Sequence, residues 1–317
     1  MKYLILVFSF ICTVLLTSEI SFSQSSFDLA YNDYGLYVGN APRARGLRIN
    51  WSDSYLEEVS GINFTLWKPK DNTGGTVKGI SIGLIAPSAD VLKGINIGGL
   101  GVAAESELTG LNVGLLGVGS GGDITGISIG LLGLGSGEDM RGISIGGLGA
   151  GVGGNSKGIL IGLIGAGAGE NMTGIQLGGI GLGAGEDMKG ISIGGIGLGA
   201  GNDISGISIG LVGVGAGRDI KGITFGGVGV ASGRDISGVT FSLGRIMVDR
   251  RGELKGLSIS SYNKILGMQT GVSIGLLNYA NNLRGVQLGI INFVPNNPGW
   301  RRILPFINWN FDSKAYR

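Results

Sequence analysis

The feature that most constrains this sequence is a sixteen-residue unit that recurs through most of its length. Each unit opens on a glycine, and ten such glycines follow one another at intervals of sixteen: Gly94, Gly110, Gly126, Gly142, Gly158, Gly174, Gly190, Gly206, Gly222 and Gly238. A period this regular indicates one small structural unit stacked many times, with each copy contacting its neighbours. The sequence is therefore more informative about architecture than about any biochemical activity.

The unit at residues 206–221 contains two short runs of alternating apolar residues. Residues 207–209 read Ile-Ser-Ile and residues 212–214 read Val-Gly-Val, and each run has the period-two pattern of a β-strand. The step from Gly210 to Leu211 shifts the phase by one, so a straight strand would place the two apolar pairs on opposite faces. A corner at Gly210 instead directs all four apolar side chains into one interior. Ile220, after a polar corner at 216–219, is expected to return inward.

This pattern predicts an all-β, single-domain repeat array: a parallel β-solenoid with about 16 residues per coil and rungs about 4.8 Å apart. Glycine, at 67 of 317 residues, suits corners with unusual backbone angles and coils so narrow that Cβ atoms would crowd. We expect an N-terminal cap with a first irregular unit at 24–60 and regular repeats at 61–242. Irregular and shorter repeats follow at 243–293, and a C-terminal cap strand at 294–317.

An antiparallel outer-membrane β-barrel, acting as a pore or a structural protein, remains the alternative. The unit length suits a transmembrane strand with a short turn, and the mean hydropathy is high at +0.35. Residues 305–311 also resemble a terminal amphipathic strand. Against the barrel, the apolar phase flips within each unit, the turns are nearly identical, and no aromatic residue lies between Trp67 and Phe225.

The N-terminus has the pattern of a secretory signal peptide. One lysine precedes an apolar run, and a small-x-small motif predicts cleavage near Ser23, so residues 1–23 are excluded from the fold. The only cysteine, Cys12, lies within this segment. The sequence thus predicts an exported protein of the periplasm, outer membrane or cell surface, whose mature form has no disulfide bond.

A column of aspartate and asparagine is expected at the polar corner. Its members are Asp123, Asp139, Asn155, Asn171, Asp187, Asp203, Asp219 and Asp235. These residue types favour turns because their side chains bond the backbone two residues on. Residues 198–205 are also similar to a calcium-binding nonapeptide, although its first glycine is Leu198 here and the spacing differs. A calcium edge therefore remains a second hypothesis for Asp123, Asp139, Asp187, Asp203, Asp219 and Asp235.

Composition argues against several classes of function. The chain has no histidine, and its acidic residues recur at corner positions, which predicts a non-enzymatic protein. The net charge of +2 is too small to indicate a nucleic-acid partner. Glycine motifs of the Gly-x-Gly-x-x-Gly type do not connect a strand to a helix, so no cofactor is expected. A specific partner is unknown, with envelope components or surface proteins as candidates.

The ends of the array differ from its middle in carrying every tryptophan: Trp51, Trp67, Trp300 and Trp309. Atypical terminal units are what a repeat array needs to cover its exposed end strands. If the rod binds a partner there, the aromatic and arginine-bearing ends are candidate contact surfaces. The residues concerned are Arg43, Arg45 and Arg48 at one end and Trp300, Arg301 and Arg302 at the other.

Two units near the C-terminus carry a family resemblance. Residues 271–280 read Gly-Val-Ser-Ile-Gly-Leu-Leu-Asn-Tyr-Ala and residues 285–294 read Gly-Val-Gln-Leu-Gly-Ile-Ile-Asn-Phe-Val. They resemble bacterial exported surface-repeat proteins with tandem Gly-Val-Gln-x-Gly-Leu-x-Asn units. The resemblance is close over about 256–311 and looser over 79–255, where glycine replaces asparagine and the corner is two residues longer. It implies an exported, envelope-associated protein and carries over no catalytic residue.

Overall fold

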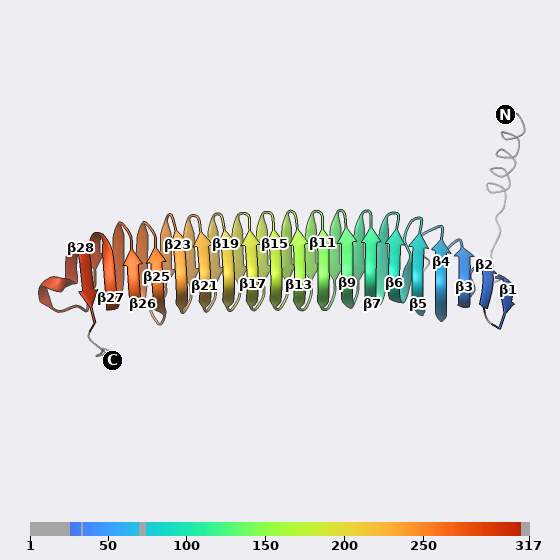
Figure 1. Cartoon of the computed structure of the whole chain (residues 1–317), viewed down its shortest axis with the longest axis horizontal. Helices are drawn as coiled ribbons and strands as arrows, with labels where there is room; N and C mark the ends of the chain where they lie inside the picture. Colours follow the sequence, from blue (N-terminus) through green and yellow to red (C-terminus); the bar gives the residue numbers. More distant parts are fainter. Residues whose placement is uncertain (1–25, 33, 70–73, 312–317) are drawn as a thin grey trace, which may run out of the picture.

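The computed structural model describes residues 26–32, 34–69 and 74–311, which form a straight rod of stacked coils (Figure 1). The rod is a parallel β-solenoid of about 15 turns with about 16 residues per turn, which confirms the predicted fold. The barrel alternative is wrong, because equivalent strands of successive coils run parallel throughout the repeats. The predicted signal peptide lies outside the described residues.

Each regular coil consists of one long and one short strand. Strand β19 (Ile204–Gly210) pairs residue for residue with β21 (Ile220–Gly226), the same strand of the next coil. The short strand β20 (Gly213–Ala216) pairs in the same way with β22 (Gly229–Ser232). The long strands form one face and the short strands the other. The two faces are joined by an apex turn at 211–212 and a second turn at 217–219.

The other coils follow the same plan. The remaining long strands are β3 (Arg43–Asn50), β4 (Glu58–Thr65), β5 (Thr76–Gly83), β6 (Ser88–Gly98), β7 (Gly101–Gly114), β9 (Asp123–Gly130), β11 (Met140–Gly146), β13 (Ser156–Gly162), β15 (Met172–Gly178), β17 (Met188–Gly194), β23 (Ile236–Ser242), β25 (Glu253–Ile259), β26 (Tyr262–Ile274) and β27 (Leu277–Phe293). The remaining short strands are β8 (Gly117–Ser120), β10 (Gly133–Ser136), β12 (Gly149–Val152), β14 (Gly165–Ala168), β16 (Gly181–Ala184), β18 (Gly197–Ala200) and β24 (Arg245–Val248).

Both ends of the stack are closed by strands that run against the others. Strand β1 (Phe27–Tyr31) is antiparallel to β2 (Tyr34–Val38), which pairs in parallel with β3. At the other end, β28 (Ile303–Asn310) follows the 3₁₀-helix η1 (Gly299–Arg302) and is antiparallel to β27. These strands cover the rims that the parallel coils would leave unpaired.

A column of glycines with positive φ runs through the long strands. It comprises Gly46, Gly61, Gly79, Gly94, Gly110, Gly126, Gly142, Gly158, Gly174, Gly190, Gly206, Gly222, Gly238, Gly256, Gly271 and Gly285. At Gly206 φ is +113°, and a Cβ atom there would lie 2.1 Å from the carbonyl oxygen of Gly190. The repeat glycine is therefore required by the close axial approach of neighbouring backbones inside the strand rather than at a corner.

The direction of the long-strand side chains differs from the prediction. Ser208 is 1% exposed and faces the interior, whereas Ile207 is 39% exposed. Val212 is exposed in the apex turn, and of the four apolar residues expected inside only Val214 is buried. Ile220 is buried, as expected. The interior between the two faces thus receives Ile204, Ser208, Val214 and Ala216, and small side chains fill this narrow space.

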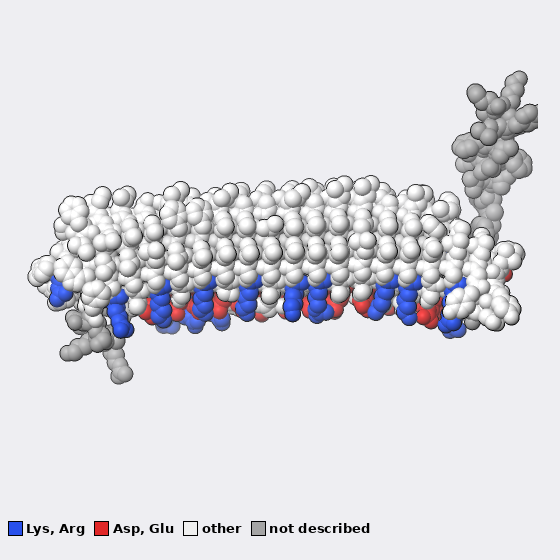
Figure 2. All heavy atoms as spheres, viewed as in Figure 1, with Lys and Arg blue, Asp and Glu red and all other residues white. Residues whose placement is uncertain are grey.

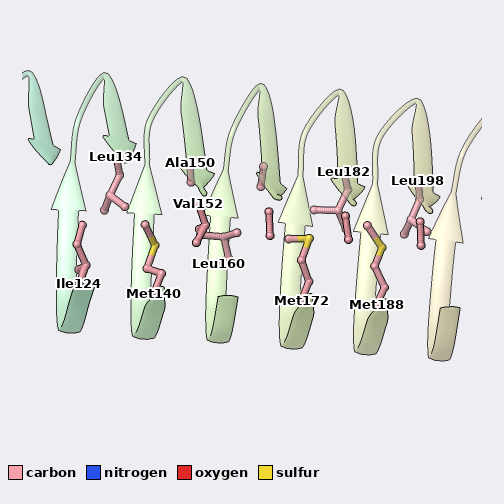
Figure 3. Close-up of a cluster of buried hydrophobic side chains, with 14 of the residues drawn as sticks. Ile124, Leu134, Met140, Ala150, Val152, Leu160, Met172, Leu182, Met188 and Leu198 are labelled. Carbon is pink, nitrogen blue, oxygen red and sulfur yellow. The ribbon is translucent and has the colours of Figure 1, made fainter. Parts of the chain in front are cut away.

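The apolar part of the interior is made of two facing columns (Figure 3). Met140, Met172 and Met188 at the start of the long strands point toward the short strands, which contribute residues such as Leu182 and Leu198. All of these side chains are at most 5% exposed. Their burial supplies the hydrophobic stabilisation of the rod, at roughly 25 cal/mol per Å² of apolar surface removed from water.

One coil exchanges a large and a small residue between two interior positions. Ser156 stands where the neighbouring coils have Met140 and Met172. In the same coil the buried Leu160 takes the place that Ser144 occupies in the preceding coil. The leucine lies between the two methionine-bearing strands in Figure 3. Volume is therefore conserved within the coil, although its distribution is inverted.

This exchange predicts a strong coupling between the two positions. Leu160→Ser alone is expected to cost about 2–5 kcal/mol because it leaves a cavity. Ser156→Met alone should cost about 1–3 kcal/mol because it overfills the coil. The double variant restores the pattern of the neighbouring coils, and its free energy of unfolding should be close to that of the parent. Chemical unfolding of all four proteins measures this coupling, and additive losses in the double variant would contradict it.

Candidate contact surfaces

The lower edge of the rod carries charged side chains of both signs along its length (Figure 2). Its basis is the aspartate and asparagine column, whose members are stacked one per coil. Each side chain accepts a hydrogen bond from the backbone N–H of the equivalent residue in the next coil, as from Asp139 to Asp123 (3.0 Å) and from Asn155 to Asp139 (2.9 Å). The bonded backbone lies in the next coil, sixteen residues on in the regular repeats and eighteen on at Asp235, so the expectation of a bond two residues on is wrong. The column connects coils.

Asp219 is the most strongly held carboxylate of this edge. Arg234 donates through Nε to Oδ1 (2.8 Å) and through Nη2 to Oδ2 (2.5 Å), and Lys221 Nζ lies 2.9 Å from Oδ2. The hydrogen bonds from Arg234 hold the pKa of Asp219 well below its usual range, against the opposing effect of burial, and Lys221 lowers it further. Arg218 likewise lowers the pKa of Asp203. The two arginine contacts join successive coils through charge.

The lowered pKa values predict that the rod weakens in acid. A carboxyl group whose pKa is lower in the folded than in the unfolded chain stabilises the fold above its unfolded pKa, near 3.9, and this contribution is lost as the pH falls through the folded pKa. We therefore expect the melting temperature to be level above about pH 5 and to fall below about pH 4. Asp219→Asn should cost about 1–3 kcal/mol at pH 7 and flatten this fall. An unchanged acid profile in the variant would contradict the assignment.

The calcium hypothesis gains no support from this edge. In the described part of the chain, no three or more acidic, histidine or cysteine side chains come together in an arrangement able to hold a metal ion. Asp123, Asp139, Asp187, Asp203, Asp219 and Asp235 lie one per coil, and their oxygens accept bonds from the next coil's backbone. A calcium ion would have to compete with those bonds.

The long-strand face carries apolar side chains outward in every coil. The residue after the repeat glycine and the residue two further on are apolar in all sixteen coils, and none is buried. The column between them points inward and is polar in all coils but that of Leu160; its members are Arg48, Asn63, Ser81, Asn96, Asn112, Ser128, Ser144, Leu160, Gln176, Ser192, Ser208, Thr224, Thr240, Ser258, Ser273 and Gln287. The long strands thus direct apolar side chains outward and polar ones inward, the reverse of the usual arrangement in a protein surrounded by water.

The apex turn extends this apolar surface around the upper edge. Its two positions hold Leu211, 64% exposed, and Val212, 47% exposed, with equivalents such as Leu131 and Leu163 in other coils. We call the outward long-strand residues and the apex residues together the aliphatic band, because most of them are aliphatic; the strands also contribute Phe64, Phe225 and Phe241, and several coils have glycine at one apex position. At about 13 Å by 4.8 Å per coil over sixteen coils it covers roughly 1,000 Å², more than the 300–600 Å² of the largest apolar patch on a typical monomer.

A row of cations and hydroxyls borders the aliphatic band on its lower side. It occupies the position before the repeat glycine, where the sixteen coils carry Arg45, Ser60, Lys78, Lys93, Thr109, Thr125, Arg141, Lys157, Thr173, Lys189, Ser205, Lys221, Ser237, Lys255, Thr270 and Arg284. Nine of these are basic and none is acidic. Several pair with acids of the lower edge, as Lys189 does with Asp187 at 3.0 Å. We call these sixteen residues the cationic row.

The two ends that the sequence proposed as contact surfaces differ in exposure. Trp300, in η1, is 71% exposed, and Arg302 beside it is exposed. Arg301 is partly covered, and its carbonyl oxygen accepts a bond from Asn308 Nδ2 at 3.0 Å. At the other end Arg43 is exposed, but Arg48 is fully buried. Arg48 is therefore part of the interior, and its proposed role in contact is wrong.

Comparisons with known proteins found no match: no family profile, no curated protein and no solved structure matches the chain. Within residues 26–32, 34–69 and 74–311, no helix has the length and apolar character needed to cross a membrane. The aliphatic band and the cationic row therefore rest on the geometry of this chain alone.

Sequence reasoning missed the aliphatic band, although a signal for it is present. Alternation counted from Ile204, which lies inside, passes through Gly206 and Ser208 and leaves Ile207 outside. The apex turn is a second signal. Two adjacent apolar residues in a tight turn, as at Leu211 and Val212, cannot both face a narrow interior.

Proposed function

We propose that this protein is an exported, non-enzymatic repeat protein of the bacterial cell envelope or surface, which acts as a rigid structural or contact element. The observation that carries the proposal is the aliphatic band, which runs along the rod beside a continuous charged edge. A surface of this size and uniformity suits sustained contact along the whole rod better than recognition of a small molecule. The resemblance to exported surface-repeat proteins and the predicted signal peptide support the placement in the envelope.

The repetition of the coil suits such a role. Every coil presents apolar residues at the same two outward long-strand positions, so contact energy accumulates with length while each coil contributes little by itself. Hydrogen bonds between successive coils stiffen the rod along both edges. At the apex the N–H of Val228 donates to Val212 O in the preceding coil at 2.7 Å. At the lower edge the aspartate column accepts bonds from the backbone of the next coil.

Cell fractionation with analysis of the N-terminus tests the proposal. We expect the chain in the envelope or surface fraction, beginning near Gln24 after removal of the signal peptide. Recovery in the cytosol with an intact N-terminus would contradict it. Turnover of a substrate by the purified chain that depends on acidic residues of the lower edge would contradict the non-enzymatic part.

A further inference from the structure

We infer that the aliphatic band is a lipid-contacting surface, and that the rod lies along a phospholipid leaflet with the apex turns in the hydrocarbon and the cationic row at the headgroups. The inference rests on the proposed envelope function and names the partner of that contact. Four features of the described residues support it: the chemistry of the band, its height, its paired backbone and the charge at its border.

The chemistry of the band matches hydrocarbon and conflicts with water. Outward positions of the long strands are apolar in all sixteen coils, while the inward position between them is polar in fifteen. Some members of the polar column bond to one another inside, as in the bond from Asn96 Nδ2 to Asn112 Oδ1 (2.8 Å) and the contact between Ser258 and Ser273 hydroxyls (2.7 Å), whereas Ser81 Oγ and Thr224 Oγ1 are buried without a partner. An uninterrupted apolar exterior is the arrangement that strands adopt where they face lipid instead of water.

The height of the band matches one leaflet. From the first outward residue, Ile207, to the apex residue Leu211 the chain rises about 13 Å at about 3.3 Å per residue. Half of a hydrocarbon core about 30 Å thick is about 15 Å. The band is therefore tall enough to fill one leaflet and too short to cross two.

Backbone N–H groups at the apex already have hydrogen-bond partners within the protein. Exposed peptide groups are excluded from hydrocarbon unless they are paired. The N–H of Gly227 donates to Gly210 O at 3.0 Å, and that of Val228 to Val212 O at 2.7 Å. The same pattern recurs at earlier coils, for example from Val212 to Ile196 O at 2.8 Å. Entry into lipid therefore leaves these N–H groups with their partners.

On the long-strand face the charges complement the layers of a leaflet. The face of the long strands in Figure 2 shows no Lys, Arg, Asp or Glu above the lower edge, and both blue and red side chains line that edge. The cationic row lies two residues below the first aliphatic position, and its ammonium, guanidinium and hydroxyl groups are donors suited to lipid phosphates. Long basic side chains at such a boundary can keep their stems on apolar surface and their charge in the headgroup layer.

A second copy of the chain fits the band less well. Two rods packed face to face would cover Ile207 and Ile209 and their equivalents, about 10 Å apart as in stacked sheets. The apex residues Leu211 and Val212 project from the edge of the rod and would remain in water. A fluid leaflet covers both the face and the convex edge.

Site-specific labelling tests the inference and its orientation. In a Cys12→Ser background, Leu131→Cys places a thiol on the apex, and Glu138→Cys places one on the opposite edge of the same coil. Both carry an environment-sensitive fluorophore. With vesicles of phosphatidylcholine and phosphatidylglycerol, emission from position 131 should shift to the blue and be quenched by nitroxide-labelled acyl chains, while position 138 should change little. Equal responses at the two positions, or no response at position 131, would overturn the inference. Binding through the N-terminal segment alone would give the second of these results.

A matched pair of triple variants tests whether the band drives binding. Replacement of Leu131, Leu163 and Leu211 by glutamine should lower the vesicle-bound fraction in flotation at least tenfold. Replacement of Glu138, Glu170 and Glu186 by glutamine on the other edge should not lower it, because this change removes only negative charge. A parent chain that forms a stable dimer in sedimentation and ignores vesicles would overturn the lipid assignment. That result would leave the envelope contact role in place, whereas cytosolic recovery would remove the role itself.

Discussion

Replacing Gly206 with alanine is expected to lower the free energy of unfolding by about 3–5 kcal/mol, one of the largest effects of any single substitution in the rod. Gly206 has φ of +113°, which L side chains rarely adopt, and its new Cβ would lie 2.1 Å from the carbonyl oxygen of Gly190. The obstacle is the backbone of the neighbouring coil, which cannot move without breaking the stack. Chemical unfolding followed by circular dichroism measures the loss.

Gly215 in the same coil is the matched control. It belongs to the short strand, and a Cβ there would meet no atom within 4 Å. Gly215→Ala should therefore be neutral or stabilising by up to about 1 kcal/mol, because alanine reduces the freedom of the unfolded chain. Equal losses at the two positions would show that the repeat glycines are not needed for axial packing.

Asp53→Ala is expected to destabilise the N-terminal coils by about 3–5 kcal/mol, because it leaves a buried guanidinium without its counter-charge. Arg48 is fully buried, and its Nη1 lies 2.6 Å from Asp53 Oδ1. Asp53 also accepts bonds from Asn50 (2.7 Å) and Thr65 (2.7 Å). The single change therefore removes the acceptor at the centre of a buried network.

Two comparisons isolate this effect. Glu57→Ala removes the exposed partner of Arg43 and should cost no more than about 1 kcal/mol. The double variant Arg48→Met, Asp53→Leu removes both buried charges and should recover most of the loss. A double variant as unstable as Asp53→Ala would show that the charge itself is not the cause. Thermal unfolding of the three variants gives the comparison.

The architecture could be predicted because it depends on period and backbone geometry. The interval of sixteen and the shift of phase at Gly210 are sufficient to predict one coil per unit and a corner at that glycine, and the turn lies one residue later, at 211–212. The positions of Asp123 through Asp235 as a stacked column follow from the same period. Their bonding partners could not be predicted, because a bond to the next coil depends on the axial spacing of the turns.

The side-chain directions could not be predicted from hydrophobicity, because hydrophobicity assumes that the surroundings are water. That assumption placed Ile207 and Ile209 inside. The two-residue alternation of side chains along the strand, counted from the buried Ile204, places Ser208 there instead. This alternation is set by backbone geometry and does not depend on the solvent. The same assumption assigned Arg48 to the surface, although it stands in the inward polar column. Hydrophobicity and the strand alternation here place different side chains inside, in coil after coil. Such a repeated disagreement indicates an apolar environment outside the rod.

Thiol accessibility at two adjacent positions tests the central claim, an apolar exterior that meets lipid. With Cys12 replaced, Ile207→Cys should react within seconds with a water-soluble maleimide in detergent-free solution and become protected when phospholipid vesicles are added. Ser208→Cys should remain unreactive in both conditions until the chain is unfolded. Rapid reaction at position 208 with protection at 207 in solution would contradict the account, because the isoleucine would then face the interior and the serine the solvent.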